Sequence, residues 1–146
     1  LPFFPGEKIT EGLDGLADRL AEYKQLCARF AKWRAVIEID ENAIPSTFGI
    51  RANAQVLARY AALCQSLDLV PIVEPEVLMD GAHGIERCEV VTSAVLEAVF
   101  AELDAHRVVF EGMLLKPNMI IPGKKCPQQA TAQAADARHA STASSR

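Results

Sequence analysis

The sequence predicts an α/β fold, a partial (β/α)8 TIM barrel with three consecutive β-α units. Short apolar runs rich in β-branched residues alternate along the chain with longer segments whose apolar residues recur at helical spacing. Charged residues stand at the ends of these runs, where barrel enzymes place their catalytic groups. A doubly wound sheet is the alternative, but no strand is followed by the G-x-G-x-x-G motif of its dinucleotide-binding form.

The first half of the chain predicts two helices with a strand between them. Apolar residues at helical spacing predict a helix over residues 10–30. Thr10 can cap its start, and Asp14 supplies negative charge in its first turn. The next elements are a buried strand, a polar loop and a second amphipathic helix, over residues 33–39, 40–46 and 50–67.

The second half repeats this unit and begins a third. It predicts a strand, a glycine-flanked loop, a helix and another strand, over residues 70–76, 79–84, 85–105 and 108–115. Strands that are apolar on both faces and separated by amphipathic helices indicate a parallel sheet. A full barrel takes roughly 250 residues. The 146 residues of this chain therefore provide only part of one.

The composition changes after Ile121. Residues 122–146 contain no Val, Ile, Leu, Met, Phe, Trp or Tyr. Such a segment buries almost no apolar surface, so we expect it to be disordered. We therefore predict a partial barrel domain over residues 1–122 and a low-complexity, disordered tail over residues 123–146. An ordinary terminal tail and an end produced by truncation or loss of reading frame in a longer gene both fit this composition.

The composition excludes several classes of function. A net charge of −4 gives no electrostatic case for binding nucleic acid or an anionic membrane. No apolar run approaches the ~20 residues of a membrane helix, and the amino end lacks the basic region of a signal peptide. The cysteines form no C-x-x-C pair and the histidines lie far from them, so we expect reduced thiols in a cytoplasmic, metal-free protein. An even number of cysteines is compatible with disulfides, but three of them fall in helical patterns as small apolar residues, which favours reduced thiols in the core: Cys27, Cys64 and Cys88.

Three charged residues occupy matching places in the repeating unit. Lys32 and Glu74 are 42 positions apart, and so are Glu74 and Lys116. A charge at the end of a buried strand is costly unless it has a partner or a function. The equal spacing on successive strands therefore predicts one shared site with two amines and a carboxylate. Glu76 and Arg34, each two residues further on, are expected on the same faces as Glu74 and Lys32.

These residue types suit Schiff-base chemistry. Apolar surroundings and a second cation, Lys32, would favour the neutral, nucleophilic form of Lys116, which attacks a ketone or an aldehyde. Glu74 would act as the general acid that expels water, and Glu76 would raise its proton affinity. Arg34 could hold a phosphate. Taken alone, each residue is more often a solvated or ion-paired charge, and Glu-Pro-Glu often only ends a strand.

Five segments form an ordered set of motifs: EGLDGL (11–16), AKWR (31–34), NAQVLARY (53–60), PIVEPE (71–76) and EGMLLKPNM (111–119). Together they resemble class I fructose-bisphosphate aldolase, in order and at similar intervals, over residues 6–126. The resemblance implies a (β/α)8 barrel, usually tetrameric, that binds a sugar phosphate and uses no metal or other cofactor. It implies the reversible cleavage of fructose 1,6-bisphosphate to dihydroxyacetone phosphate and glyceraldehyde 3-phosphate in glycolysis and gluconeogenesis.

The resemblance also implies roles for the charged residues. Lys116 matches the Schiff-base nucleophile on the sixth strand of the barrel. Glu74, on the fifth strand, matches the residue that moves protons in carbinolamine dehydration and carbon–carbon cleavage, and Glu76 matches the second glutamate near the lysine. Lys32, on the fourth strand, matches a lysine that assists Schiff-base formation and substrate binding. Arg34 matches a basic residue of the phosphate region.

The resemblance covers strands four to six only, so the chain looks like an internal piece of an aldolase with a non-homologous end. Counterparts of the first-strand aspartate, the third-strand lysine, the phosphate loops after strands seven and eight and the carboxyl-terminal tyrosine are absent from it. Two hypotheses stay open. The chain is part of an active class I aldolase, or it is a truncated remnant without activity of its own. The Lys-Trp-Arg and Leu-Leu-Lys-Pro-Asn-Met motifs together disfavour another Schiff-base aldolase family.

Overall fold

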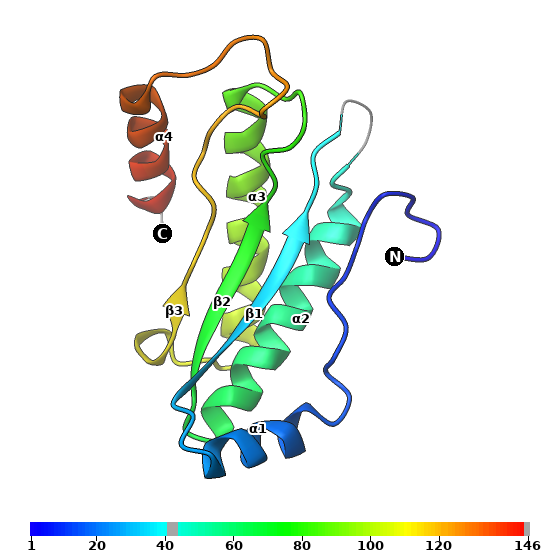
Figure 1. Ribbon diagram of the computed structural model, residues 1–146, viewed down its shortest axis with the longest axis vertical. Coiled ribbons are helices and arrows are strands. Elements are labelled where there is room, and N and C mark those ends of the chain that lie inside the picture. The colour runs from blue at the N-terminus through cyan, green and yellow to red at the C-terminus, as the bar shows by residue number, and fades with distance from the viewer. Residues whose placement is uncertain (41–43, 145–146) are drawn as a thin grey trace.

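The computed structural model describes residues 1–40 and 44–144 of the chain. Three parallel strands form one sheet in the order β1-β2-β3, and helices α2 and α3 lie together on one face of it (Figure 1). The predicted α/β fold with three consecutive β-α units is therefore confirmed. The elements are α1 (Leu16–Gln25), β1 (Phe30–Ile37), α2 (Thr47–Ser66), β2 (Val70–Val77), α3 (Ile85–Ala105), the 3-10 turn η1 (Phe110–Gly112), β3 (Leu114–Leu115) and α4 (Ala132–Ser144).

The register of the strands separates two sets of side chains. β1 pairs with β2 so that Lys32 stands opposite Ile72 and Arg34 stands opposite Glu74. Because neighbouring residues of a strand point to opposite faces of the sheet, the residues between them point the other way, toward the helices. On β1 Trp33, Ala35 and Ile37 are buried on this face, and Ala31 is partly buried. One face of the sheet therefore forms the core, and the other carries the charged residues.

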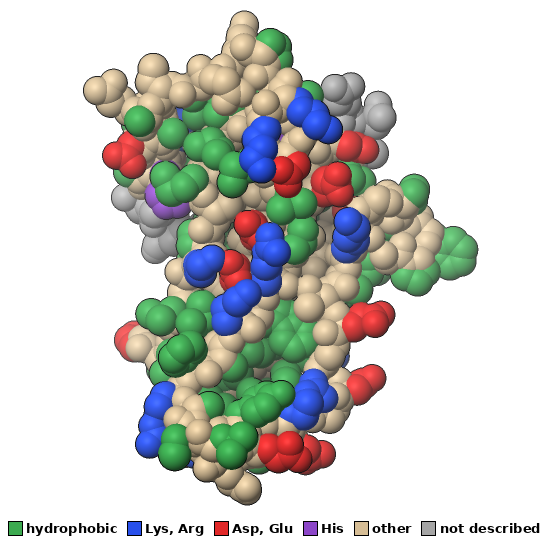
Figure 2. Space-filling model, viewed as in Figure 1, with side chains coloured by type: hydrophobic (Ala, Val, Ile, Leu, Met, Phe, Trp, Pro, Cys, Tyr) green, Lys and Arg blue, Asp and Glu red, His purple; other side chains and the backbone are tan. Residues whose placement is uncertain are grey.

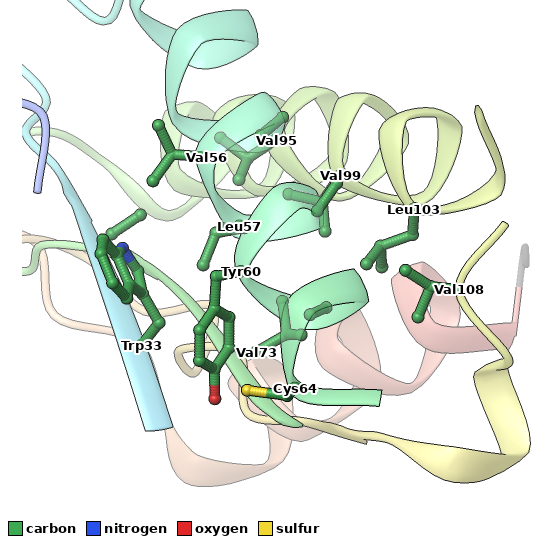
Figure 3. Close-up of a cluster of buried hydrophobic side chains, with 14 of the residues drawn as sticks. Trp33, Val56, Leu57, Tyr60, Cys64, Val73, Val95, Val99, Leu103 and Val108 are labelled. Atoms are coloured by element: carbon green, nitrogen blue, oxygen red, sulfur yellow. The ribbon is translucent and has the colours of Figure 1, made fainter. Parts of the chain in front are cut away.

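Helix α2 lies at the centre of the core (Figure 3). Leu57 is fully buried, and the rings of Tyr60 and Trp33 have their centroids 5.4 Å apart. The Tyr60 hydroxyl donates a hydrogen bond to the backbone carbonyl of Ala31, and burial raises the pKa of Tyr60 above its ordinary value. Burial also raises the pKa of the Cys64 thiol to about 11, so this thiol is neutral at physiological pH.

Helix α2 begins three residues before its predicted start because a hydrogen-bonded cap fixes it there. The Ser46 hydroxyl accepts a hydrogen bond from the N–H of Gly49 at 2.9 Å. The carboxylate of Glu7 in turn accepts hydrogen bonds from the N–H and the hydroxyl of Ser46, at 2.7 and 2.6 Å. The amino-terminal segment is thereby tied to the start of α2. Of the predicted loop over residues 40–46, positions 41–43 lie outside the described residues.

Helix α1 is much shorter than the helix predicted over residues 10–30. It begins only after Gly15, whose φ of 63° is left-handed and interrupts the helical backbone. Thr10 is therefore not its cap, and that prediction was wrong; the Thr10 hydroxyl instead donates to the carbonyl of Arg34 at 2.6 Å. At the other end Cys27, with a φ of 67°, turns the chain out of the helix.

The prediction of a strand over residues 108–115 was wrong for most of its length. The side chain of Gln65, in α2, forms hydrogen bonds with both backbone groups of Val109. Its Oε1 accepts from the N–H at 2.9 Å, and its Nε2 donates to the carbonyl at 2.8 Å. These groups are then not available to a strand ladder. The turn η1 follows, and β3 pairs with β2 only from Leu114.

Residues 123–144 differ from the predicted disorder, and positions 145–146 lie outside the described residues. The N–H of Gly123 donates to the carbonyl of His83 at 2.8 Å, which anchors this segment to the loop before α3. Further on, Arg138 of α4 forms ion pairs with two glutamates of α3, Glu86 and Glu89. Charge pairing with α3 thus holds a helix that has few large apolar side chains. The domain boundary after residue 122 stays a prediction.

All four cysteines are free; Cys64 and Cys88 are buried, but Cys27 is exposed, so the expectation that it is a core residue was wrong. None of the described helices is both long and apolar enough to cross a membrane. Within residues 1–40 and 44–144, no three His, Cys, Asp or Glu side chains are grouped in a way that could hold a metal ion.

We expect Leu57→Ala to lower the free energy of unfolding by roughly 2–5 kcal/mol, because Leu57 has no exposed surface. Leu26→Ala removes the same atoms from a side chain that is 80% exposed, so it should change stability by less than about 0.5 kcal/mol. Urea unfolding followed by circular dichroism measures both changes. Equal costs for the two variants would contradict the placement of the core.

Candidate active site

Charged side chains gather at the middle of the sheet face that lies opposite α2 and α3 (Figure 2). Glu74 of β2 lies between two lysines from the neighbouring segments. Nζ of Lys32 is 2.9 Å from Oε2 of Glu74, and Nζ of Lys116 donates a hydrogen bond to Oε1. The structure therefore brings together the three residues that are equally spaced in the sequence.

The strand register explains how these side chains meet. Leu115 of β3 pairs with Val73, and the N–H of Lys116 donates to the carbonyl of Val73 at 2.8 Å. This bond places Lys116 beside Glu74, the residue that follows Val73. On the other strand, Lys32 lies one two-residue repeat before the position opposite Glu74, a distance that its long side chain covers.

The other two predicted residues form a second ion pair beside the first. Nε of Arg34 donates a hydrogen bond to the carboxylate of Glu76. This hydrogen bond and the charge of Glu76 raise the pKa of Arg34. Glu74 and Glu76 stand two residues apart on β2, but each has its own cationic partner. They are therefore two separate ion pairs rather than two carboxyl groups sharing a proton.

Glu74 is the buried charge of the site, with 5% of its surface exposed. Burial acts to raise the pKa of its carboxyl group, but hydrogen bonds and charges from Lys116 and Lys32 outweigh burial and hold the pKa below its usual 4.5. The prediction that Glu76 raises the proton affinity of Glu74 was therefore wrong. Two lysines in direct contact have more effect than a carboxylate that is itself neutralised by Arg34.

The prediction of apolar surroundings for Lys116 was also wrong. Its side chain is 63% exposed, and its amine contacts the carboxylate of Glu74. The reason is that the helices α2 and α3 cover the opposite face of the sheet. Lys32, whose side chain is 46% exposed, lies on the same open face. Both amines are thus accessible to a small molecule.

Asn118 is a further residue beside the site, and the sequence patterns alone did not predict it. Its amide oxygen accepts a hydrogen bond from the backbone N–H of Val77 at 3.1 Å, and its amide nitrogen donates to the hydroxyl of Thr92 at 3.3 Å. The signal in the sequence is its position, an amide directly after a proline and two residues after Lys116. Neither partner of the amide is close in sequence, so the pattern alone does not reveal the contact.

The chain is similar in sequence to known proteins of one family. The family model "Glycolytic: Fructose-bisphosphate aldolase class-I" matches residues 1–144. The chain belongs to the class I fructose-bisphosphate aldolase family. The match extends past position 126, where the resemblance found in the sequence ended, and includes α4. The end of the chain, predicted as non-homologous, thus lies largely within the family model.

Individual aldolases give the same result. The chain is 60% identical over 127 residues to a probable class 1 fructose-bisphosphate aldolase of Xanthomonas axonopodis and 54% identical over 134 residues to the fructose-bisphosphate aldolase of Dictyostelium discoideum. These alignments cover 87% and 91% of this chain, which spans only 38% of the length of each relative.

A solved structure fixes the fold. The aldolase of Plasmodium falciparum, crystallised with TRAP and a small-molecule inhibitor, matches with a TM-score of 0.95 at 49% identity. That match covers 97% of this chain and 41% of the solved chain. The partial barrel predicted from the sequence is therefore confirmed: the three β-α units are part of an aldolase fold.

We expect acid to weaken the fold through Glu74. Because its pKa is lowered by folding, the unfolded chain binds more protons at this residue, and the stabilisation present above pH 4.5 is lost as the pH falls through the folded-state pKa. The free energy of unfolding should therefore fall more steeply below pH 4.5 in the wild-type chain than in Glu74→Gln. Urea unfolding over a series of pH values measures both slopes.

A control for the loss of one carboxylate is Glu11→Gln, since Glu11 is exposed. This variant should keep the wild-type pH dependence. A Glu74→Gln variant with the same acid sensitivity as the wild-type chain would show that Glu74 is not held ionised by its two lysines.

Proposed function

We propose that this chain contributes the Schiff-base centre of a class I fructose-bisphosphate aldolase, with Lys116 as the nucleophile. The observation that carries the proposal is a buried glutamate paired with two lysines, in a chain of this family. The reaction is the reversible cleavage of fructose 1,6-bisphosphate to dihydroxyacetone phosphate and glyceraldehyde 3-phosphate, a step of glycolysis that runs in reverse in gluconeogenesis.

The reaction begins with a proton transfer. Lys116 gives a proton to Glu74, with which it is hydrogen-bonded, and its neutral amine attacks the C2 carbonyl carbon of the sugar. The attacking nitrogen loses a proton, and the carbonyl oxygen takes up this proton as the carbinolamine forms. Glu74 then donates its proton to the departing hydroxyl, water leaves, and a protonated Schiff base remains on Lys116.

The Schiff base supplies the electron sink for cleavage. The C3–C4 bond breaks, its electrons move into the iminium group, and Glu74 accepts the proton of the C4 hydroxyl. Glyceraldehyde 3-phosphate leaves as the aldehyde, and an enamine remains on Lys116. Protonation at C3 restores the Schiff base, and hydrolysis releases dihydroxyacetone phosphate and the free amine.

The remaining charged residues prepare this site for its substrate. Lys32, 2.9 Å from Glu74, stabilises the carboxylate that remains after Glu74 has donated its proton to the departing hydroxyl. Arg34 has a side chain that is 46% exposed, and its planar guanidinium suits a phosphate group. Glu76 orients Arg34 through their ion pair. By analogy with the family, we place the protein in the cytoplasm, as a tetramer that needs no metal or other cofactor.

One observation favours a second candidate, a remnant without activity of its own. The amine of Lys116 is largely exposed and paired with Glu74, whereas a Schiff-base lysine must lose its proton. A lysine is driven to its neutral form by removal from water. If no other part of the protein covers this face, the site keeps its charges and the amine stays unreactive.

Borohydride trapping tests the proposal. We expect dihydroxyacetone phosphate and sodium borohydride to modify Lys116 selectively, because reduction fixes the Schiff base as a stable secondary amine. Peptide mass spectrometry of the trapped chain locates the adduct. The Lys116→Met variant should give no selective adduct.

Lys124 provides a matched comparison inside the same molecule. Its side chain is 65% exposed and lies 2.8 Å from Asp80, so it resembles Lys116 in exposure and in having a carboxylate partner. An adduct on Lys116 that far exceeds the one on Lys124 supports the aldolase site. Equal labelling of the two lysines in a folded chain would favour the inactive remnant.

A further inference from the structure

A proline interrupts the strand ladder beside the proposed nucleophile. β2 and β3 run parallel with Val73 opposite Leu115, and the N–H of Lys116 donates to the carbonyl of Val73. If the ladder continued, the next donor from β2 would be position 75, which is a proline. A proline has no N–H and cannot donate to a strand ladder. Backbone hydrogen bonding between these strands is therefore broken immediately after Lys116, the residue that most needs a fixed position.

The side chain of Asn118 bridges this break. Its Oδ1 accepts a hydrogen bond from the N–H of Val77 at 3.1 Å, a donor that a neighbouring strand would otherwise satisfy through a carbonyl. Its Nδ2 donates to the hydroxyl of Thr92 on α3 at 3.3 Å and to its neighbour's carbonyl, that of Met119, at 3.0 Å. Thr92 is buried, with 2% exposure, so the amide is anchored in the core.

The backbone around Lys116 is thus held by hydrogen bonds before and after the following proline. Before the proline, its own N–H donates to Val73; after the proline, Asn118 ties the chain to β2 and α3. We propose that Asn118 is a positioning residue, whose side-chain amide replaces the missing strand bond and so holds the amine of Lys116 on Glu74. The chemical importance of that position rests on the proposed function; the position itself does not.

The residue type fits this task. An amide provides both the acceptor for Val77 and the donor for Thr92 without adding charge. An aspartate here could accept from Val77 but could not donate to Thr92. An alanine would supply neither group, so the amide is the side chain that serves both partners.

A second side-chain amide of the same chain can be compared with that of Asn118. Gln65 also joins separate elements through two hydrogen bonds, both to Val109. Its partner Val109 lies at the start of the segment that leads into β3, whereas Asn118 lies just after Lys116. Gln65→Ala therefore removes an amide clamp of the same kind without touching the site. Thr92→Val removes the hydroxyl to which Asn118 donates and keeps the size of the side chain at position 92.

The experiment compares Asn118→Ala, Thr92→Val and Gln65→Ala in the full chain. The first readout is the titration of the Glu74 carboxyl carbon by NMR, which needs no activity. We expect Asn118→Ala to raise the pKa of Glu74 toward the ordinary 4.5, because the amine of Lys116 moves away from it. Thr92→Val should give a smaller shift in the same direction, and Gln65→Ala should give none.

The second readout is the rate of borohydride trapping on Lys116 with dihydroxyacetone phosphate. In Asn118→Ala we expect the rate at saturating ligand to fall on the order of tenfold or more, with little change in the half-saturating concentration, because the amine is misplaced rather than the ligand lost. A purely structural role would instead lower the amount of folded chain and affect Gln65→Ala as much.

The outcomes distinguish the proposed function from the positioning role of Asn118. If the wild-type chain traps no adduct, the proposed function fails for this chain, and the titration of Glu74 still decides the role of Asn118. An unchanged titration in a folded Asn118→Ala overturns the positioning role, as does an equal shift in Gln65→Ala. If Asn118→Ala does not fold, Thr92→Val decides: the expected shift supports the role, and its absence overturns it.

Discussion

The burial of one carboxylate is the constraint on which the rest of the site depends. Glu74 is almost fully buried on the central strand, where an unpaired charge would be strongly destabilising. Each of its two oxygens forms an ion pair with an amine from a different segment, Lys32 on one side and Lys116 on the other. Shifting either neighbouring strand by one residue would turn its lysine to the wrong face and leave Glu74 with one partner fewer. The ion pairs fix the register of the strands more than they add stability, because buried ion pairs contribute little net free energy after desolvation.

The alternation of the strands keeps this polar site apart from the core. Trp33 and Val73 point to the helix side, and their neighbours Lys32 and Glu74 point to the open side. Helix α2 packs on the apolar face and supplies Tyr60, whose hydroxyl binds the backbone of β1. The site residues thus stand on a sheet whose other face is held rigidly. A scaffold of this kind can fix an amine and a carboxylate within hydrogen-bond distance even where the site itself is exposed.

The sequence allowed prediction of those features that follow from regular spacing of residues along the chain. Helix α3 has the predicted bounds of residues 85–105, and the equal spacing of the charged residues correctly brought Lys32 and Lys116 to Glu74. Contacts between distant residues were not predictable. The valines near residue 108 have strand propensity, but Gln65 takes the backbone groups of one of them. In the same way, the apolar residues before Lys116 suggested a buried amine, although burial depends on what covers the opposite side of the sheet.

The exposure of Lys116 also determines where its proton lies. In water, a charged Lys116 and a charged Glu74 are each well solvated, and their hydrogen bond favours the ionised pair. Removing water reverses the balance, because two buried charges cost more than a neutral amine beside a neutral acid. One proton moving along the existing hydrogen bond would then create both groups that the proposed mechanism needs, a nucleophilic amine and a protonated glutamic acid. Lys32, still charged and 2.9 Å from Glu74, would make that acid a better donor. Covering this face, by substrate or by other parts of a barrel, is therefore the step that turns a stable ion pair into a reactive one.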